Sequence, residues 1–576
     1  MLPYINVPFE YVGGRIGASV DELKLIFSFL ISYPLAAVLK RIPDSKPWQK
    51  NVFTISVSLF YLLGLFNLGT GLIVLLINAI GAYAIAFYID GPFMPWIAFV
   101  FLMGYMSVSH IYRQIVEDPS VVDITGAQMV MIMRLTAFCW NVHDGQLPES
   151  DLSDFQKDRA IRQLPSLLDY FGYVFFFPSL LIGPAFDYVD YERYITTTMF
   201  NLPPGVDPSK APPTRKKRRI PRSGRPAGLK AATGIGWILL FLNLSGYYYP
   251  DYLLSPEYMT HGFFRRVWLL HMVGVVTRMK YYGVWTLTEG ACILSGIGYK
   301  GVDPVTGKAS WDRLQNVKPF AIELAQNTHA YLGNWNINTN HWLRNYVYLR
   351  VTAKGKKPGF RASMATFITS AFWHGFYPGY YLTFVLASFN QYIAKNARRL
   401  FRPFFIEVPS PTAAPPTPGT KPKEQGTKYK IYYDIATWFI TQAAFSFTVA
   451  PFILLTFSAS MTVWVRVYCY CIIGVIASVA FLFSPGKAYV VKQLKRRTGT
   501  DKRPEIARQE SARAGTTLGL PDDPEQELQE IVAEVKKEIE SRRQRGMSVD
   551  LDVKKVVQEK LDALRNRKAD DEKKEL

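Results

Sequence analysis

The stretch Ser370-Ala-Phe-Trp-His-Gly-Phe-Tyr-Pro-Gly-Tyr-Tyr-Leu-Thr-Phe384 places a single histidine, His374, in an apolar and aromatic setting. It belongs to an apolar run over residues 361–394, and a run of about twenty such residues can cross a membrane as a helix. An ionisable group at that depth is costly unless it faces a cavity or a partner. Two interpretations of His374 follow: a group that exchanges a proton near neutral pH, or a hydrogen-bonded histidine that packs between helices.

Runs of the same kind fill most of residues 20–485, whereas the residues beyond them are almost all polar. The chain has 576 residues, 49% of them hydrophobic, and a formal net charge of +20. That length would also fit roughly two or three soluble domains. The distribution of apolar residues instead favours an all-α polytopic membrane protein with about ten to twelve transmembrane or re-entrant helices. The predicted spans are 22–41, 52–66, 68–89, 93–113, 121–141, 164–186, 232–250, 263–296, 327–348, 361–394, 432–457 and 460–484.

The hydropathy pattern divides the chain into three parts. Residues 1–20 form a polar N-terminal segment that lacks the features of a cleaved signal peptide. Residues 21–485 form the membrane domain. Residues 486–576 form a charged tail, in which apolar residues at helical spacing predict amphipathic helices. These helices are either solvated or engaged in self-association or a membrane-surface contact.

Two polar insertions interrupt the membrane domain. Segment 201–231 is rich in proline, carries the basic run Arg215–Arg219 and is predicted to resist folding. Residues 407–428 form a second linker, rich in Pro and Lys. Basic runs also occur in nuclear signals and nucleic-acid sites, but the short basic loops of a polytopic protein stay in the cytosol. We therefore expect cytosolic loops and no nucleic-acid partner, with attraction to anionic head groups as a secondary role.

The sequence ends with Lys573-Lys-Glu-Leu576. Lysines at the third and fourth places from the end resemble the dilysine retrieval signal of endoplasmic reticulum membrane proteins, which requires a cytosolic C-terminus. Signals of this kind are addresses that receptors read. We therefore expect a multi-pass protein of the endoplasmic reticulum membrane with its C-terminus in the cytosol.

A second polar segment lies upstream of His374, in Gly333-Asn-Trp-Asn-Ile-Asn-Thr-Asn-His-Trp-Leu-Arg344, where asparagine occupies every second position from 334 to 340. Amide side chains at membrane depth must be paired or must bind something. Residues two apart are rotated by about 200° on a helix, so Asn336 and Asn338 cannot share one helical face. Each amide is therefore either a helix–helix contact or cap, or part of a binding site.

The segments Trp335–Leu343 and Phe372-Trp-His-Gly375 together resemble the paired signature of the membrane-bound O-acyltransferases. More narrowly, they are similar to the lysophospholipid acyltransferase branch, with the fungal broad-specificity enzymes as the nearest group. Further segments agree in order with this branch: Gly183–Tyr188, Lys280–Glu289, Asn345–Val351 and Gly355–Arg361. The resemblance covers roughly residues 20–485 and leaves the polar tail outside it.

This resemblance implies a helical bundle around a central substrate tunnel. It also implies transfer of an acyl group from acyl-CoA to the free glycerol hydroxyl of a lysophospholipid, at sn-2. An alcohol is a poor nucleophile until a base takes its proton, and His374 matches the family histidine that would be this base. Asn336 matches the family asparagine, which would stabilise the tetrahedral oxyanion or orient the substrate or His374. Positioning of two bound substrates suffices, without a covalent acyl-enzyme.

A wider set of residues is predicted to bind substrates or support the site: Asp144, Tyr281, Tyr282, Glu289, Trp335, Asn338, Trp342, Arg344 and Trp373. For Glu289 the alternative is a buried ion pair with Arg278 or Lys280, and for Asp144 it is a structural turn. Basic residues flank the motifs at Arg344, Arg350, Lys354, Lys356 and Lys357. They either meet CoA phosphates or are ordinary charges at a membrane edge.

The partners implied are acyl-CoA, a lysophospholipid and membrane lipids, and the oligomeric state stays open. Acyl-CoA would be a co-substrate, and no bound cofactor is expected. The other histidines, at positions 110, 143, 261, 271, 329 and 341, lack the spacing of metal ligands, so no metal is expected. Rival functions are acylation of a sterol, a diacylglycerol or a protein within the same family. A transporter whose intramembrane His and Asn line a permeation path is a rival from another class.

Overall fold

The computed structural model describes residues 4–17, 19–116, 123–203, 205–352, 360–407 and 426–498. Within these ranges almost all regular structure is helical, which confirms the all-α prediction. Two short strands, β1 (Gly301–Val302) and β2 (Ala309–Ser310), pair antiparallel. The predicted amphipathic helices of the tail, its final residues and most of linker 407–428 lie outside the described residues.

The helices follow one another along the chain with short connections. The longer ones are α2 (Val20–Leu39), α3 (Pro47–Leu59), α4 (Gly69–Tyr88), α5 (Met94–Val116), α6 (Thr125–Gly145), α10 (Gly224–Leu244), α12 (Phe263–Ser295), α16 (Phe360–His374), α17 (Pro378–Phe401), α18 (Lys430–Leu454), α20 (Tyr470–Leu482) and α21 (Pro485–Thr498). The shorter ones are α1 (Val7–Ile16), α7 (Asp154–Arg159), α8 (Leu167–Val174), α9 (Tyr188–Ile195), α11 (Pro256–Met259), α13 (Pro319–Glu323), α14 (Thr328–Gly333), α15 (Ile337–Leu343) and α19 (Phe457–Arg466). Two π-helical turns, η1 (Phe60–Leu65) and η7 (Arg344–Tyr348), follow α3 and α15 directly. Single 3-10 turns are η2 (Glu149–Asp151), η3 (Phe177–Ser179), η4 (Thr198–Phe200), η5 (Pro208–Lys210), η6 (Pro250–Leu254) and η8 (Arg402–Phe405).

Several of these helices are long and apolar enough to cross a membrane. In the described part of the chain they are α2, α4, α5, α10 and α18. The pair α19 and α20 bends by 78° and forms either a broken sixth span or a re-entrant loop. All of these overlap predicted spans, although α10 begins eight residues before the predicted span 232–250. Other predicted runs form helices that the protein itself buries, such as α6 and α12. The chain is therefore a multi-pass membrane protein.

Several predicted spans are not continuous helices. Span 361–394 divides into α16 and α17, span 460–484 divides into α19 and α20, and two others contain irregular backbone. In 164–186, α8 is followed by an irregular segment, because Pro178 and Pro184 cannot continue an α-helix. In 327–348, the chain breaks into α14, α15 and η7 around Asn336, whose backbone lies in the left-handed region. Irregular backbone at membrane depth is tolerated only where protein surrounds it or where it lines a cavity. We therefore expect neighbouring helices to surround these two irregular segments.

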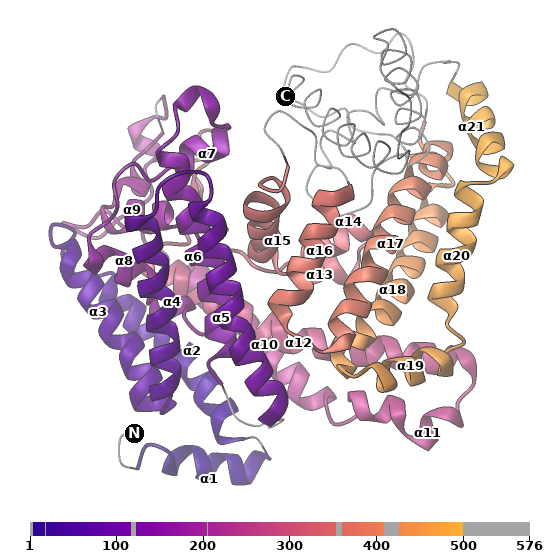
Figure 1. Ribbon diagram of the computed structural model, residues 1–576, viewed down its shortest axis with the longest axis horizontal. Coiled ribbons are helices and arrows are strands. Elements are labelled where there is room, and N and C mark those ends of the chain that lie inside the picture. Colours follow the sequence, from indigo (N-terminus) through magenta and orange to yellow (C-terminus); the bar gives the residue numbers. More distant parts are fainter. Residues whose placement is uncertain are drawn as a thin grey trace, which may run out of the picture.

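The helices form two groups with a pair of long helices between them. Figure 1 shows α2–α9 on one side of the molecule and α14–α21 on the other. Helix α12 packs along α10, α2 and α18 and so connects the groups. Helix α6 packs on α4 and α5 and also contacts α15 and η7, which carry the asparagine segment. Helix α16, which ends at His374, packs on η7, so the segments that carry the two signature motifs meet.

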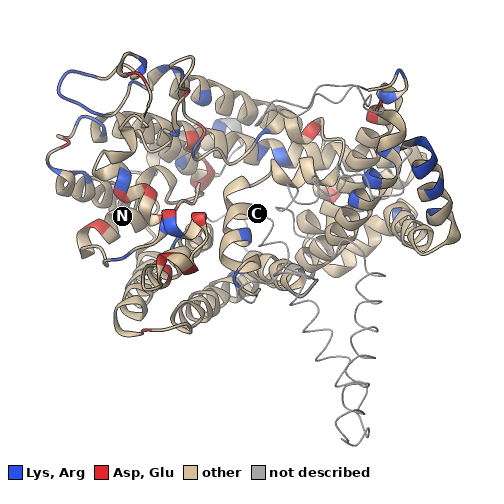
Figure 2. Ribbon diagram, turned by 90° about the horizontal axis from the view of Figure 1, so that it is seen from above, with Lys and Arg blue, Asp and Glu red and all other residues tan. Residues whose placement is uncertain are grey.

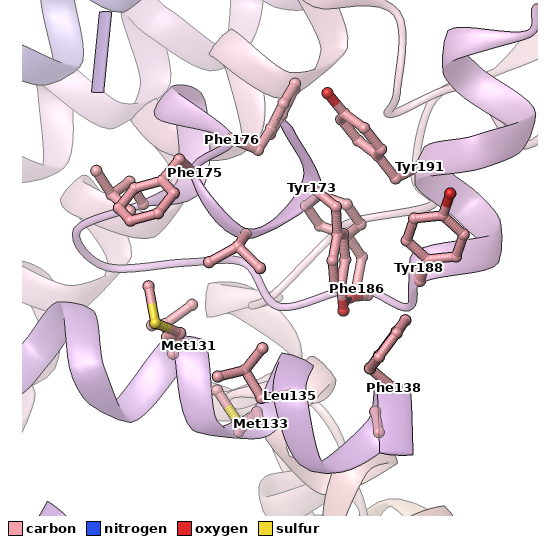
Figure 3. Packing of buried hydrophobic residues seen from close by; sticks show 14 of the residues in the cluster. Met131, Met133, Leu135, Phe138, Tyr173, Phe175, Phe176, Phe186, Tyr188 and Tyr191 are labelled. Carbon is pink, nitrogen blue, oxygen red and sulfur yellow. Dashed lines mark hydrogen bonds between the residues drawn. The ribbon is translucent and has the colours of Figure 1, made fainter. Parts of the chain in front are cut away.

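One face of α6 forms an aromatic core with the segment that follows α8. Figure 3 shows Met131, Leu135 and Phe138 of α6 on the side of this helix that faces Tyr173 and Tyr188. The rings of Phe138 and Tyr188 lie 5.9 Å apart between centroids. Residues three or four apart share a helical face, so this core occupies one side of α6 and leaves the opposite side for other partners.

A buried arginine holds the irregular segment after α8. Arg134 of α6 is 1% exposed, and its cation lies 4.5 Å from the ring centroid of Phe186. Its guanidinium donates to the backbone carbonyl oxygens of Tyr173, Val174, Ser179 and Pro184 and to the Ser179 hydroxyl. An ionised group in the interior must form hydrogen bonds. The Arg134 guanidinium forms them with backbone carbonyl groups at the end of α8 and in the irregular segment after it.

The Pro-rich insertion 201–231 is folded in its described residues, which corrects its prediction as an unfolded loop. Turn η5 is followed by a hairpin in which Thr214 and Pro221 face each other, and α10 begins at Gly224. Lys and Arg gather on this insertion and along α21 (Figure 2). The insertion folds because Ile220, 1% exposed, joins the main hydrophobic core.

Candidate active site

His374 is the last residue of α16, at the point where the chain turns back into α17. Gly375 ends the helix with a φ of +118°. The imidazole is enclosed by aromatic rings, with centroid distances of 4.7 Å to Trp373, 4.9 Å to Phe452, 5.4 Å to Phe384 and 5.6 Å to Tyr380. Among the described residues none forms a hydrogen bond with either ring nitrogen of His374, so both nitrogens are available to a ligand.

A second histidine lies directly behind the turn that carries His374. The Nε2 atom of His110, on α5, is 3.1 Å from the carbonyl oxygen of Trp373. A carbonyl accepts, so Nε2 carries the hydrogen. A Cβ on Gly375 would lie 3.1 Å from Nδ1 of His110, so only glycine allows this close approach together with the positive φ. His110 was not predicted as a site residue, although a histidine in an apolar run is the same signal that identified His374.

The two signature tryptophans are bound to one helix. The indole Nε1 of Trp373 donates to the carbonyl oxygen of Met129 at 3.1 Å, and that of Trp342 donates to the Thr136 hydroxyl at 2.9 Å. Both acceptors belong to α6, and the two indole rings lie 6.1 Å apart between centroids. Each tryptophan is less than 5% exposed. Helix α6 therefore fixes the spacing between the histidine motif and the asparagine motif.

Further contacts with α6 fix the rest of the asparagine segment. The Thr339 hydroxyl lies 3.3 Å from Sδ of Met133, and the Tyr346 hydroxyl donates to Oδ1 of Asn141 at 3.1 Å. Met133 and Thr136 share a helical face because they are three residues apart. The segment from α15 through η7 is thus bonded to α6 at several successive turns.

Asn336 occupies the N-terminal cap of α15 with φ 45° and ψ 54°. The left-handed region is uncommon for residues with a side chain, although asparagine tolerates it, and it is often found at functional sites. The Oδ1 atom of Asn336 accepts a hydrogen bond from the Thr339 hydroxyl at 2.9 Å. An amide whose oxygen is engaged in this way presents its NH₂ group as a donor, and within the described part of the chain that NH₂ group has no acceptor.

Three predicted residues form an aromatic cluster beside Asn336. The ring of Trp335 lies 5.6 Å from Tyr281, 6.0 Å from Tyr282 and 4.9 Å from Trp285 of α12, measured between centroids. The Tyr282 hydroxyl donates to a Glu323 carboxylate oxygen at 2.7 Å, which fixes this ring. Tyr281 is 36% exposed and is therefore the member best placed to touch a ligand.

Glu289 has a different partner from the two that were predicted. Its carboxylate is 1% exposed, and Nζ of Lys230, on α10, lies 2.8 Å from it. Arg278 and Lys280 instead pair with other carboxylates, at 2.7 and 3.7 Å. Nine or more residues separate them from Glu289 on one helix, a rise of roughly 13 Å or more. Lys230 of the neighbouring helix α10 lies level with Glu289. The predicted buried ion pair of Glu289 is therefore present, but it joins two helices.

Asn338 is hydrogen-bonded to another segment of the protein. Its amide nitrogen donates to Oδ1 of Asn316 at 3.0 Å, and its backbone N–H donates to the same oxygen at 3.1 Å. As predicted, Asn336 and Asn338 serve different surroundings, and Asn338 holds α15 on the segment that follows β2. The Arg344 guanidinium donates to Oδ1 of its neighbour Asn345 at 3.2 Å.

Asp144 forms a buried ion pair at the end of α6. It lies in the last turn of this helix, not in the turn that was its alternative interpretation, and is fully buried. The guanidinium of Arg350 donates to its two oxygens at 2.6 and 2.5 Å and lies 4.4 Å from the Trp140 ring centroid. Arg350 was predicted either to meet CoA phosphates or to be an ordinary charge at a membrane edge, and its guanidinium is instead occupied by Asp144. Lys354, Lys356 and Lys357 lie outside the described residues.

Comparison with known proteins gives a family and several close relatives. The model of the membrane-bound O-acyltransferase family matches residues 117–419. The chain is 43% identical over 498 residues to a lysophospholipid acyltransferase of Schizosaccharomyces pombe, covering 86% of this chain and 93% of that protein. It is 40% identical over 475 residues to a lysophospholipid acyltransferase of Saccharomyces cerevisiae, covering 81% and 74%. It is 31% identical over 444 residues to the human membrane-bound glycerophospholipid O-acyltransferase 2, covering 76% and 78%.

Proposed function

The chain belongs to the membrane-bound O-acyltransferase family, and from this premise we propose that it is an acyl-CoA-dependent lysophospholipid acyltransferase. It esterifies the free glycerol hydroxyl of a lysophospholipid, at sn-2. The names of the relatives from two yeasts support the lysophospholipid acceptor. The acyl-CoA donor and the sn-2 position come from the resemblance of the two signature motifs.

The observation that carries this proposal is that helix α6 holds both an unbonded imidazole and an oriented amide. His374 lies in an aromatic surround without a hydrogen-bond partner among the described residues. The NH₂ group of Asn336 is presented as a donor because Thr339 engages its oxygen. Both residues are carried by segments bonded to the same face of α6, through Trp373 and through Trp342. A base and an oxyanion donor on one rigid support are the two groups that acyl transfer to an alcohol needs.

The proposed reaction proceeds in two steps. A nitrogen of His374 takes the proton of the lysophospholipid hydroxyl while its oxygen bonds to the thioester carbonyl carbon. The carbonyl oxygen becomes an oxyanion, to which the Asn336 NH₂ group donates. The tetrahedral intermediate then collapses, the carbon–sulfur bond breaks, and the proton passes from His374 to the CoA thiolate. The products are a diacyl phospholipid and CoA, and His374 returns to its neutral form.

The aromatic surround serves this chemistry by excluding water. Trp373, Tyr380, Phe384 and Phe452 leave little room around the imidazole for bulk solvent. A dry site strengthens the hydrogen bond from the amide to the oxyanion and limits hydrolysis of the thioester. We place the basic insertion on the cytosolic side of the membrane, because the short basic loops of polytopic proteins stay on that side.

Acyl transfer in isolated membranes tests the proposed function. Membranes from cells without other lysophospholipid acyltransferases would receive labelled acyl-CoA and a panel of lysophospholipids, diacylglycerol, a sterol or a peptide. We expect diacyl phospholipid from the wild type. His341→Ala, at an exposed position of α15, should also form it and is the control for His374→Ala. Label in sterol ester, triacylglycerol or peptide, with none in phospholipid, would contradict the proposed acceptor. No acyl transfer to any acceptor would contradict the enzyme assignment itself.

A further inference from the structure

The insertion before α10 contains a compact basic hairpin (residues 213–222). Thr214 and Pro221 face each other in an antiparallel bridge, and the backbone N–H of Arg222 donates to the Pro213 carbonyl at 2.9 Å. The turn between the arms includes Lys217, whose φ is 58°. Five successive cationic residues, Arg215-Lys-Lys-Arg-Arg219, occupy the turn and its flanks. Their placement is therefore set by a defined backbone and not by an extended loop.

The basic hairpin is anchored on the body of the protein. Ile220 is 1% exposed, and a Cβ on Gly296, at the end of α12, would lie 2.6 Å from its Cγ2 atom. Nζ of Lys40 donates to the Pro221 carbonyl and to the Ser223 hydroxyl. These contacts bury the return arm and leave the cationic arm facing outward, because Arg215, Lys216, Lys217 and Arg219 are exposed.

In the described part of the chain, few carboxylates face the charge of the basic hairpin. An open groove of about 530 Å³ is lined by Asp44 and by residues 214–219. Asp44 is the one carboxylate in this lining, and its two oxygens accept from Nζ of Lys50 at 2.8 Å and from the Arg219 backbone N–H at 2.9 Å. Burial lowers the pKa of Lys40 to about 8, and the charge of Arg215 adds a smaller effect in the same direction.

The basic hairpin lies at the ends of two membrane spans. Its anchoring residue Lys40 directly follows α2, and the Arg218 guanidinium donates to the carbonyl oxygen of Arg41 in the same loop at 2.8 Å. On its other side, Ser223 directly precedes α10. Both α2 and α10 are long and apolar enough to cross a membrane. The groove is therefore held close to the head-group layer on one side of the bilayer.

We propose that the groove of the basic hairpin binds the phosphate of an anionic glycerophospholipid at the membrane surface next to α2 and α10. Arginine and lysine bind phosphate oxygens through charge-assisted hydrogen bonds, and each cation near an anionic surface contributes roughly a fivefold gain in affinity. The position at two span ends favours a lipid over a soluble anion. This site is separate from the acyl-transfer site in the interior and does not depend on the proposed function.

Binding to the purified full-length protein in detergent tests this site. The probes are phosphatidylserine and phosphatidylcholine with the same fluorescent acyl chains, followed by anisotropy at low and high salt. The variant Arg215→Gln/Lys216→Gln/Lys217→Gln removes three exposed charges, and Arg215→Lys/Lys216→Arg/Lys217→Arg keeps them as a matched control. We expect the wild type and the control to bind phosphatidylserine more tightly than phosphatidylcholine. The affinity of the glutamine variant for phosphatidylserine should fall at least tenfold. High salt should weaken the same preference, because it screens exposed charges.

Two results would overturn the proposal. One is an unchanged preference for phosphatidylserine in a glutamine variant whose unfolding temperature matches the wild type. The other is displacement of phosphatidylserine by millimolar inorganic phosphate at constant ionic strength, which would assign the groove to a soluble phosphate. The single variant Lys216→Gln keeps the test decisive if the triple variant does not fold, and its expected loss is roughly fivefold. Because binding is measured directly, a failure of the proposed enzymatic activity would not affect the outcome.

Discussion

Trp342 and Trp373 lie 6.1 Å apart between ring centroids, and both donate their indole hydrogens to α6. Trp342 belongs to the asparagine motif and Trp373 directly precedes His374. Their acceptors, Thr136 and the carbonyl of Met129, are seven residues apart and so lie nearly two turns apart on one side of the helix. The two tryptophans are 31 residues apart in sequence (373 − 342), and this shared support holds their motifs close together.

Thr136→Val tests that support. The substitution keeps the shape of the side chain and removes the acceptor of the Trp342 indole, which would leave a buried donor unsatisfied at a cost of about 1–3 kcal/mol. We expect a lower unfolding temperature and a reduced kcat, measured on purified protein in detergent. Thr233→Val, at an exposed position of α10, is the matched control and should change neither. Wild-type activity and stability in Thr136→Val would show that α6 does not position the motifs.

Asn336→Ala tests the oxyanion donor. Loss of one such donor lowers kcat by roughly 100- to 1000-fold in well-studied enzymes, and we expect a loss of this order with little change in KM. Thr339→Val should produce a smaller loss in the same direction, because it releases the Asn336 oxygen without removing the amide. Asn334→Ala is the control, since that amide bonds only to the Ala330 carbonyl among the described residues. A change in KM alone would instead make Asn336 a substrate-binding residue.

His110 is predicted to be a positioning residue for His374. Its Nε2–H donates to the Trp373 carbonyl and its ring fills the space beside Gly375. His110→Leu should lower kcat by at least about tenfold while KM stays near the wild-type value, because a displaced base misaligns the proton transfer. His110→Gln, which can still donate to the carbonyl, should recover most of the activity. Equal losses in both variants would limit His110 to packing.

The pair of Glu289 and Lys230 is predicted to be structural. Removing one partner of a buried ion pair leaves an uncompensated charge and costs roughly 3 kcal/mol. Lys230→Met should therefore lower the unfolding temperature clearly, and Lys230→Met/Glu289→Gln should regain most of that loss. If the double variant is stable but inactive on every lysophospholipid head group, Glu289 has the alternative role in substrate binding.

Local patterns in the sequence predicted the helices and the two motifs, because membrane crossing demands long apolar runs and His374 and Asn336 are costly exceptions within them. Contacts between distant segments were not predictable in this way. The partner of Glu289 is on another helix, and the support for Trp342 and Trp373 comes from α6, which is more than 190 residues away in the case of Trp342. The irregular segment after α8 depends on Arg134, whose acceptors are fixed only when the chain is folded.

The most direct test of the central claim is the rate of phospholipid formation by purified His374→Ala at saturating acyl-CoA and lysophospholipid. Loss of a general base lowers the rate by roughly 100- to 10,000-fold, and we predict a loss in this range with an unfolding temperature like that of the wild type. His341→Ala, measured in parallel, should retain wild-type activity. Acyl transfer by folded His374→Ala at the wild-type rate would contradict the assignment of His374 as the base.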